Sequence, residues 1–517
     1  MRVLSMLGLA AVITTSVYNE PVSAFQKQEP IQFEQQELKL DHDVNGSVLA
    51  LSMQTADQMN LVVKGQNEDG QKIFSIYGLN DSGKLSPTPA HQITMPEDAL
   101  FYDFGAVFEK DIQVLLFLNH EGVQYYDVSD KSIKPLVMSP SIYLKGENPQ
   151  LQSLDFARDV SGDEVADILI PGFDGYRLFT LNQVGGFREQ LLNMQVEMRI
   201  GGANPRFAGG SAPRFSRFPS YSFDINFDGR DDLVFLKDQD FISFFQKEDG
   251  TFEEDATNIP LGLRVTGNSW VEQIKANERY ADQTNLVETS IHVIEDLNGD
   301  DIVDIMTETD NAAGVFNRRT SYSIHPGRND GGKLAFDAEP TSTFEVKGLR
   351  YQTRHVDLDN DGNTDFGAAS VKIGIGKIIG ALISGSTDAT LSFFKHGSDG
   401  RFSEKPIYTK GVPVKFNLSS GNTSIPFVEL ADVTGDGLED LLLNDKQKGI
   451  KIYRGQNEKR VFARKAEKIA VEMPASGNRI NVVDLNGDDE SDLIIHFDRL
   501  GSDGLENRNR VIIMMSK

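Results

Sequence analysis

The sequence predicts an all-β fold: a β-propeller of four-stranded antiparallel blades, with eight blades favoured over seven. An acidic phrase of nine residues, with Asp at its first, fifth and ninth positions, recurs six times. The first Asp residues stand at positions 159, 224, 296, 357, 432 and 484. A separation of this size suits a repeated unit of several strands. Apolar runs typical of strands follow each copy, and radial repetition of such units leaves few exposed edges.

Residues 1–24 are predicted to be a secretory signal peptide. Arg2 precedes an apolar stretch from Val3 to about Thr15, and residues 22–24 form a small-residue cleavage site. The apolar run is shorter than the roughly twenty residues that a membrane-spanning helix needs, and no longer run follows. We therefore expect residues 25–517 to be a single propeller domain, exported to the periplasm or the extracellular space, with no transmembrane segment in the mature chain.

The composition narrows the possible partners and chemistry. The 517 residues carry a formal net charge of −26 and include no cysteine. An acidic chain of this kind is not expected to bind nucleic acid. Without cysteine there is neither a disulfide framework nor a thiol nucleophile. In an exported protein without disulfides, bound metal ions are expected to stabilise the fold instead.

Two faded units precede the first acidic copy. Residues 103–111 keep Asp at both outer positions but have Val107 at the centre, and residues 52–60 have Ala56 there. Strand-like runs at residues 112–117 and 61–63 follow them. We expect two structural blades whose loops have lost the metal, which brings the count to eight.

The six full copies have the donor pattern of a calcium loop. Calcium takes six to eight oxygen ligands at about 2.3 to 2.6 Å, so a short loop must turn alternate side chains inward and add a backbone carbonyl, here from position 7. Position 6 favours positive φ, which Gly229, Gly362 and Gly437 tolerate freely and Glu164 tolerates least. The expected ligands of up to six Ca²⁺ ions are position 1 (Asp159, Asp224, Asp296, Asp357, Asp432, Asp484), position 3 (Ser161, Asn226, Asn298, Asp359, Thr434, Asn486), position 5 (Asp163, Asp228, Asp300, Asp361, Asp436, Asp488) and position 9 (Asp167, Asp232, Asp304, Asp365, Asp440, Asp492).

Two other interpretations of these loops are an EF-hand and a set of simple hairpin turns. An EF-hand needs a bidentate Glu at position 12 before a helix, and none of the copies has one. The other alternative is a set of hairpin turns held by local hydrogen bonds of Asp and Asn side chains. A turn needs one such residue, whereas each copy crowds three carboxylates into nine residues, which favours a cation.

The last unit is one strand short. Strands are expected at residues 481–484, 493–495 and 511–515, and no further strand follows before Lys517. The stretch 31–40 precedes the first unit without a partner of its own. We therefore expect this N-terminal strand to pair with residues 511–515 and close the ring.

Long insertions indicate where a ligand could bind. In a four-stranded meander the first and third connections share one face, and the calcium loops are all first connections. The insertions at about residues 200–219, 262–285, 311–319 and 372–388 fall in the other class and should gather on the opposite face. In the first of these insertions an arginine and aromatic cluster suits anionic or sugar ligands, although its arginines could instead pair with neighbouring carboxylates. The candidate residues are Arg206, Phe207, Arg214, Phe215 and Arg217.

The loops, the Asp-Leu-Leu/Val runs after them, and the Gly-x-Phe turns at residues 186–187, 250–252 and 400–402 resemble FG-GAP/VCBS repeats. These are the blades of integrin α-chain propellers and of many bacterial exported proteins. The resemblance covers most of the mature chain. It implies the propeller and the calcium, and it says little about activity.

The main functional hypothesis is a non-catalytic, exported propeller that binds a protein or glycan ligand on the face opposite the calcium loops. No paired histidines at metal-ligand spacing, no Gly-x-Ser-x-Gly elbow and no phosphate loop appear in the sequence. The alternative is a calcium-dependent polysaccharide lyase or hydrolase, since some eight-bladed propellers with calcium resemble this architecture. A lyase needs a base and cations beside an acidic sugar, for which Arg206, Arg214, Arg318 and Arg319 would have to converge.

Overall fold

The computed structural model describes residues 29–517, apart from residues 57, 81–82, 144–151, 183, 195–196, 201–212, 217, 266–286, 312–317, 373, 375, 377–379, 381–384, 418–421, 446–447, 458–459 and 498–502. The predicted signal peptide lies outside the described residues. So do Arg206, Phe207 and Arg217 of the arginine and aromatic cluster.

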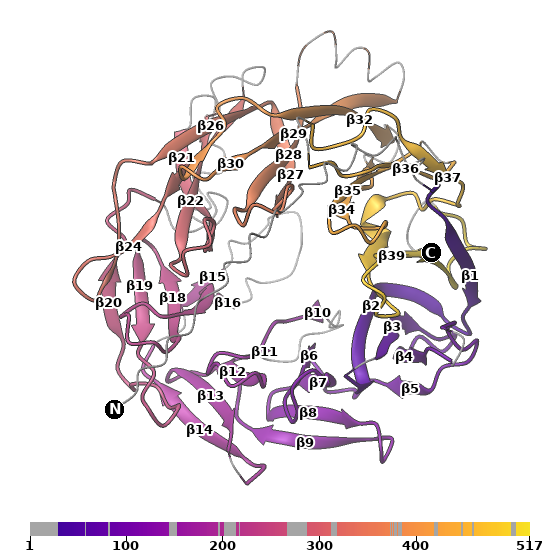
Figure 1. Ribbon diagram of the computed structural model, residues 1–517. Helices are drawn as coiled ribbons and strands as arrows, with labels where there is room; N and C mark the ends of the chain where they lie inside the picture. Colours follow the sequence, from indigo (N-terminus) through magenta and orange to yellow (C-terminus); the bar gives the residue numbers. More distant parts are fainter. Residues whose placement is uncertain are drawn as a thin grey trace, which may run out of the picture.

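Eight sheets form a ring, and Figure 1 shows strands such as β2, β11 and β27 toward its centre and β5, β14 and β32 toward its outside. Blade I contains β2 (Asp43–Thr55), β3 (Gln58–Gln66), β4 (Lys72–Gly78) and β5 (His91–Thr94). Blade II contains β6 (Phe101–Gly105), β7 (Val114–Leu118), β8 (Gly122–Asp127) and β9 (Ser132–Met138), with β10 (Gln152–Ser153) parallel to β6. Blade III contains β11 (Ala157–Arg158), β12 (Asp167–Pro171), β13 (Tyr176–Leu181) and β14 (Phe187–Leu192). Blade IV contains β17 (Ser220–Phe223), β18 (Asp232–Lys237), β19 (Asp240–Phe244) and β20 (Thr257–Pro260).

The second half of the ring repeats this order. Blade V contains β21 (Val287–Glu295), β22 (Asp304–Asn311), β23 (Arg319–His325) and β26 (Ser342–Lys347). Blade VI contains β27 (Leu349–Val356), β28 (Asp365–Val371), β29 (Ser386–Phe394) and β32 (Tyr408–Asn417), extended by β33 (Asn422–Ser424). Blade VII contains β34 (Val428–Ala431), β35 (Asp440–Asn444), β36 (Ile450–Tyr453) and β37 (Glu467–Ile469). Blade VIII contains β38 (Ile480–Val483), β39 (Asp492–His496) and β40 (Arg510–Ser516), and β1 (Phe33–Lys39) is its outer strand.

The N-terminal strand closes the ring as predicted. β1 pairs antiparallel with β40 over seven residues, from Phe33 opposite Ser516 to Lys39 opposite Arg510. The two ends of the described chain therefore share one blade, and Figure 1 shows the indigo β1 beside the C-terminus. Leu38, 3 % exposed, packs with apolar residues of blades I and VIII. The predicted fold class and the count of eight blades are confirmed.

The hydrophobic core lies between blades. Each of the apolar clusters in the described part of the chain draws its residues from two neighbouring blades, so the core runs around the ring. Blades III and IV, for example, share a cluster that contains Leu178 and Leu233. Second strands such as β12 and β39 are buried along their whole length because both faces of each sheet are covered. This explains why the strands after the acidic loops are unbroken apolar runs.

The two faces of the ring differ in the connections they carry. All six acidic loops join the first strand of a blade to its second, as predicted. The third connections return to the same face, where β24 (Gly327–Asn329) with β25 (Leu334–Phe336), and β30 (His396–Gly397) with β31 (Arg401–Phe402), form small hairpins. The long insertions are second connections or links between blades, again as predicted.

The faded units are blades I and II. Residues 106–113 join β6 to β7 as the first connection of blade II. In blade I, β2 and β3 extend through most of residues 52–60, so a short hairpin turn replaces a nine-residue loop. The carboxylate of Asp103 accepts the backbone N–H groups of Phe156 and Ala157 from blade III, at 2.7 and 2.9 Å. It links two blades instead of lining a loop.

Candidate functional site

Each acidic loop is organised by backbone amides that point at its first and fifth carboxylates. In the loop of residues 357–365, Asp357 accepts the N–H of Asp361 (3.2 Å) and that of Gly362 (2.8 Å). Asp361 in turn accepts the N–H of Asn363 at 3.0 Å. In the other five copies, too, the position-6 N–H donates to the position-1 carboxylate and the position-7 N–H to the position-5 carboxylate, for example Gly437 N–H to Asp432 at 2.6 Å and Leu438 N–H to Asp436 at 3.0 Å. The carboxylates are thereby fixed in a tight turn whatever else they bind.

Two positions of every loop adopt the left-handed backbone conformation. The prediction for position 6 is confirmed: φ is positive in all six copies, including 68° at Glu164. Position 4 has positive φ as well, which was not predicted from the sequence; the residues there are Gly162, Phe227, Gly299, Asn360, Gly435 and Gly487. The signal was present, because four of these six are glycine, the residue that adopts this conformation without strain.

The ninth position is the buried end of each loop. Its six aspartates are at most 1 % exposed. Asp440 shows the pattern: one carboxylate oxygen accepts the N–H of Gly455, at the end of the third strand, at 2.7 Å, and the other accepts that of Val433, in the loop, at 3.2 Å. Burial raises the pKa of Asp167, Asp365 and Asp440 to about 7 and that of Asp232, Asp304 and Asp492 to about 6. These carboxylates tie the loop to the sheet.

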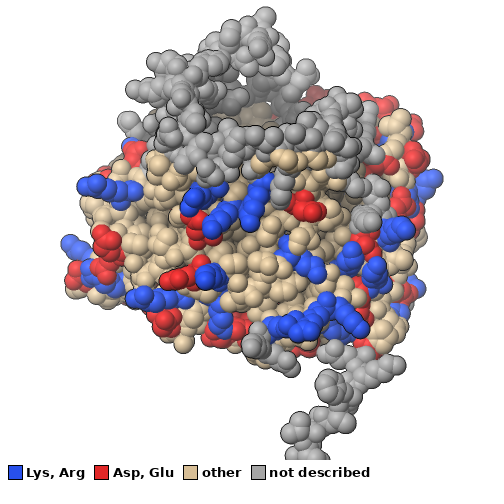
Figure 2. All heavy atoms as spheres, turned by 90° about the horizontal axis from the view of Figure 1, so that it is seen from above, with Lys and Arg blue, Asp and Glu red and all other residues tan. Residues whose placement is uncertain are grey.

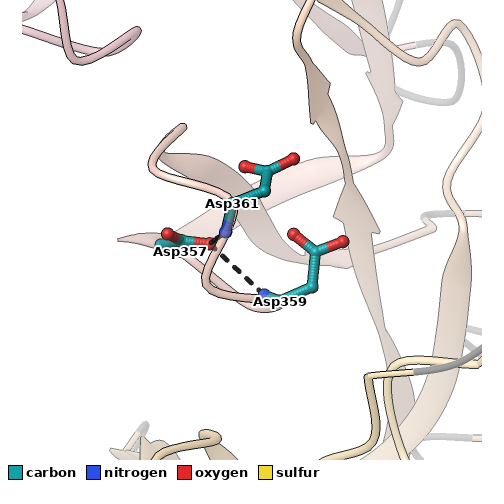
Figure 3. Close-up of side chains that lie close together, drawn as sticks. All are labelled: Asp357, Asp359 and Asp361. Atoms are coloured by element: carbon teal, nitrogen blue, oxygen red, sulfur yellow. Dashed lines mark hydrogen bonds between the residues drawn. The ribbon is translucent and has the colours of Figure 1, made fainter. Parts of the chain in front are cut away.

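The loop of blade VI brings three carboxylates together. Asp357, Asp359 and Asp361 each have an oxygen within 4.8 Å of the others, and Figure 3 shows them around one turn of the chain. It is the one such group of acidic or histidine side chains among the described residues. Asp359 Oδ1 is buried and has no hydrogen-bond partner there. The ammonium of Lys395 contacts Asp359 and lies 3.1 Å from Asp361 Oδ2, so one positive charge offsets part of the negative charge of the cluster.

The donor chemistry of the loops fits a hard divalent cation. The side chains at positions 1, 3 and 5 supply only oxygens, as calcium prefers. Asp359 Oδ1 is a buried polar atom that lacks the partner which buried oxygens normally have. In blade IV the guanidinium of Arg230 lies 2.5 Å from Asp228, a second case of a basic side chain at a position-5 carboxylate. Calcium at the six loops remains a prediction.

Neighbouring loops are also bonded to one another. Position 8 of one loop donates its N–H to the backbone of the loop before it in two places: Thr364 to Leu297 (3.0 Å) and Ser491 to Asp432 (2.7 Å). The amide of Asn360 donates to the carbonyl of Gly437 at 2.5 Å. Neighbouring acidic loops are therefore linked by hydrogen bonds, and a loop with a fixed conformation helps to fix the conformation of the loop beside it.

The predicted ligand cluster is described only in part. Arg214 and Phe215 belong to β16 (Pro213–Ser216), which pairs with β15 (Glu197–Ile200) so that Arg214 is opposite Arg199. Of the arginines considered for a lyase, Arg319 is exposed and forms an ion pair with Glu345 at 3.3 Å. Whether the arginines of the insertion converge lies outside the described residues.

A cavity lies between blades III and IV. Its volume is about 370 Å³, and its lining combines aromatic rings with charged groups: Asp155, Phe156, Arg158, Leu169, Tyr176, Phe218, Pro219, Ser220 and Tyr221. Most of these residues precede β11 and β17 or begin β13 and β17, which places the cavity toward the face opposite the acidic loops. The guanidinium of Arg158 donates to the carbonyl of Ser220 at 2.7 Å and holds the two blades together at its edge. Burial raises the pKa of Tyr221, so its hydroxyl stays protonated.

The outer surface mixes charges of both signs. On the side seen in Figure 2, basic and acidic side chains alternate without one continuous basic area. Ion pairs are common among the described residues, for example Lys134 with Asp127 at 2.7 Å. Within the described residues, no helix has both the length and the apolar character to cross a membrane.

One segment of the chain matches a known repeat family. Residues 432–495 match the family model of the FG-GAP-like repeat. A search of curated proteins gives no match. Among solved structures, the chain is similar to an Agrocybe aegerita lectin described as recognising non-reducing terminal N-acetylglucosamine (13 % identity, 94 % of this chain and 96 % of that chain covered, TM-score 0.39). It is also similar to the V. cholerae biofilm matrix protein Bap1 (13 % identity, 95 % and 89 % covered, TM-score 0.34).

The matched segment starts at the first Asp of the fifth acidic loop and ends in β39 of blade VIII, so it contains two of the six loops. The other four loops share the bonds from positions 6 and 7, the positive-φ positions and the place in their blades. The chain thus folds as an eight-bladed β-propeller, and its residues 432–495 match the FG-GAP-like repeat.

Proposed function

We propose that the protein is an exported, calcium-binding propeller that binds a glycan without catalysis, on the face opposite its acidic loops. The cavity between blades III and IV is the observation that carries the binding role. It has the size of a small-ligand pocket, which is typically about 300 to 1,000 Å³.

The lining of the cavity suits a sugar. Tyr176, Phe218 and Tyr221 offer aromatic surface on which the apolar face of a sugar ring can pack. Asp155 is exposed at the edge and can accept hydrogen bonds from hydroxyl groups, while Arg158 can donate. A protein ligand would need a larger contiguous surface than this cavity supplies, so the glycan is the favoured ligand class.

Calcium has a structural role in this proposal. The loops link blade to blade through backbone hydrogen bonds, and each contains several carboxylates in a short turn. When bound, a divalent ion would offset their mutual repulsion and hold the loop. The residues of positions 1, 3, 5 and 9 would hold it, and position 9 also anchors the loop to the sheet.

Glycan binding is tested with a microarray of neutral and uronic-acid oligosaccharides, followed by calorimetry with the best binder. We expect Asp155→Ala and Arg158→Gln to weaken binding at least tenfold, because each removes a polar contact at the cavity edge. Asp174→Ala, which changes another exposed carboxylate of blade III, is the matched control and should bind as the wild type does. Equal affinity in all three variants would place the ligand elsewhere. Release of an unsaturated sugar from a uronic-acid polysaccharide would instead favour the lyase.

Export is tested by the N-terminus of the mature protein. Expressed with its own leader, the protein should be recovered from the periplasm or the medium, and mass spectrometry should give Phe25 as the first residue. The reason is the small-residue site at residues 22–24. Recovery of the chain in the cytoplasm with residues 1–24 intact would contradict export.

A further inference from the structure

Two histidines from neighbouring blades face each other between the innermost strands of blades V and VI. His292 lies on β21 and His355 on β27 (Figure 1). Their Nε2 atoms are 3.1 Å apart, and the rings are 5.2 Å apart between centroids at an interplanar angle of 30°. The residues are 63 positions apart in the sequence, so the pair exists only in the folded ring.

A β-bulge presents the first of these side chains. In the pairing of β21 with β22, Ile291 is opposite Thr307 and Val293 is opposite Met306, which leaves His292 as the extra residue. A bulge of this kind redirects a side chain, and bulges are common beside functional sites. The regular pairing of β21 with β22 is therefore interrupted at His292, the residue that contacts His355.

A half-buried carboxylate lies beside the ring of His292. Glu308 Oε2 lies 3.0 Å from His292 Nδ1, and the guanidinium of Arg350 lies 2.8 Å from the same oxygen. Arg350 stabilises the negative charge of Glu308, and this charge favours a proton on the nearby Nδ1 of His292. In the neutral ring this leaves a lone pair on Nε2, which is the arrangement of most histidines that bind metal ions.

The distance between the two nitrogens suits a shared metal ion. At a Zn–N length of about 2.0 to 2.1 Å, tetrahedral or octahedral angles place two ligand nitrogens about 2.9 to 3.4 Å apart. A hydrogen bond between the rings is the other explanation of 3.1 Å, and it requires a proton on one Nε2. The protein does not impose that tautomer, because His355 Nδ1 has no hydrogen-bond partner among the described residues.

We propose that His292 and His355 bind one transition-metal ion, with Zn²⁺ as the expected ion, through their Nε2 atoms. Glu308 is a positioning residue that acts through His292. The side chain of His292 is 11 % exposed, so water can complete the coordination. Imidazole nitrogens favour zinc over calcium, which separates this site from the carboxylate loop that begins two residues after His355.

Calorimetry on the full chain in excess calcium, with zinc chloride as titrant, should give one zinc site per chain. We expect His292→Ala and His355→Ala to weaken it at least 100-fold, and Glu308→Gln to weaken it 10- to 100-fold through the orientation of His292. His120→Ala is the control, since His120 is exposed and lies in blade II; its zinc affinity should equal that of the wild type.

Crystals of the wild-type protein grown with calcium and zinc provide a test that needs no variant. Anomalous diffraction at the zinc edge should show a peak between the two imidazole rings. A map without that peak, zinc only at the acidic loops, or unchanged zinc affinity in both folded alanine variants would each overturn the proposal.

Discussion

Removal of calcium should lower the melting temperature of this protein by about 15 °C. An ion that binds only the folded state stabilises it by about 2.7 kcal/mol when its concentration is a hundred times Kd. The shift in melting temperature is the stabilisation by the six ions together divided by the entropy of unfolding. That entropy is about 2.1 cal/mol/K per residue, or roughly 1 kcal/mol/K for a chain of this length. Calorimetric scans at neutral pH with excess calcium and with excess chelator measure the difference.

One loop at a time can be examined in the same way. Asp436→Ala removes the central carboxylate of the blade VII loop and should lower the number of bound calcium ions by one and the melting temperature by about 2 to 3 °C. Asp330→Ala, which changes an exposed aspartate in the turn between β24 and β25, should alter neither. Equal melting temperatures with calcium and with chelator would contradict the metal assignment of all six loops.

The second large effect is a reversal of pH dependence by calcium. Without metal, the protein should be less stable at pH 8 than at pH 5, by several kcal/mol. The folded state raises the pKa of the six position-9 aspartates to about 6 or 7, from the ordinary value near 4. Between these values the folded state binds more protons than the unfolded state, so the stabilisation is present below about pH 4 and is lost as the pH rises through 6 to 7.

Three histidines act in the opposite direction. Burial lowers the pKa of His91, His396 and His355, the last to about 4, so their contribution is present above pH 6.5 and is lost as the pH falls. Six aspartates outweigh three histidines between pH 5 and pH 8. With calcium bound, the ionised carboxylates are neutralised by the metal, and stability should rise with pH instead. Chemical unfolding at both pH values, with calcium and with chelator, tests this. A metal-free protein that is more stable at pH 8 would contradict it.

The blades could be predicted from the sequence because their signals are local. The acidic loops, the apolar second strands and the turns each occupy about ten residues, and repetition multiplies a weak signal. Ring closure by residues 31–40 was also predicted, because the last unit lacked a strand and the first stretch lacked a partner. The left-handed conformation at position 4 was missed, although Gly299 and three other glycines marked it.

The sequence by itself determined the repeat, the number of blades and the oxygen donors of the loops, since alternation and turn chemistry act over a few residues. Only the tertiary structure decided which side chains from different blades meet. The histidine pair joins residues 292 and 355, and the cavity joins residues 155–158 to residues 218–221. Such contacts depend on the register of particular strands, on their bulges and on the angle between adjacent sheets. A shift of the strand register by one residue would turn each side chain to the other face of its sheet. The physical reason is that the core of a propeller lies between blades, where neighbours in space are some sixty residues apart in the chain.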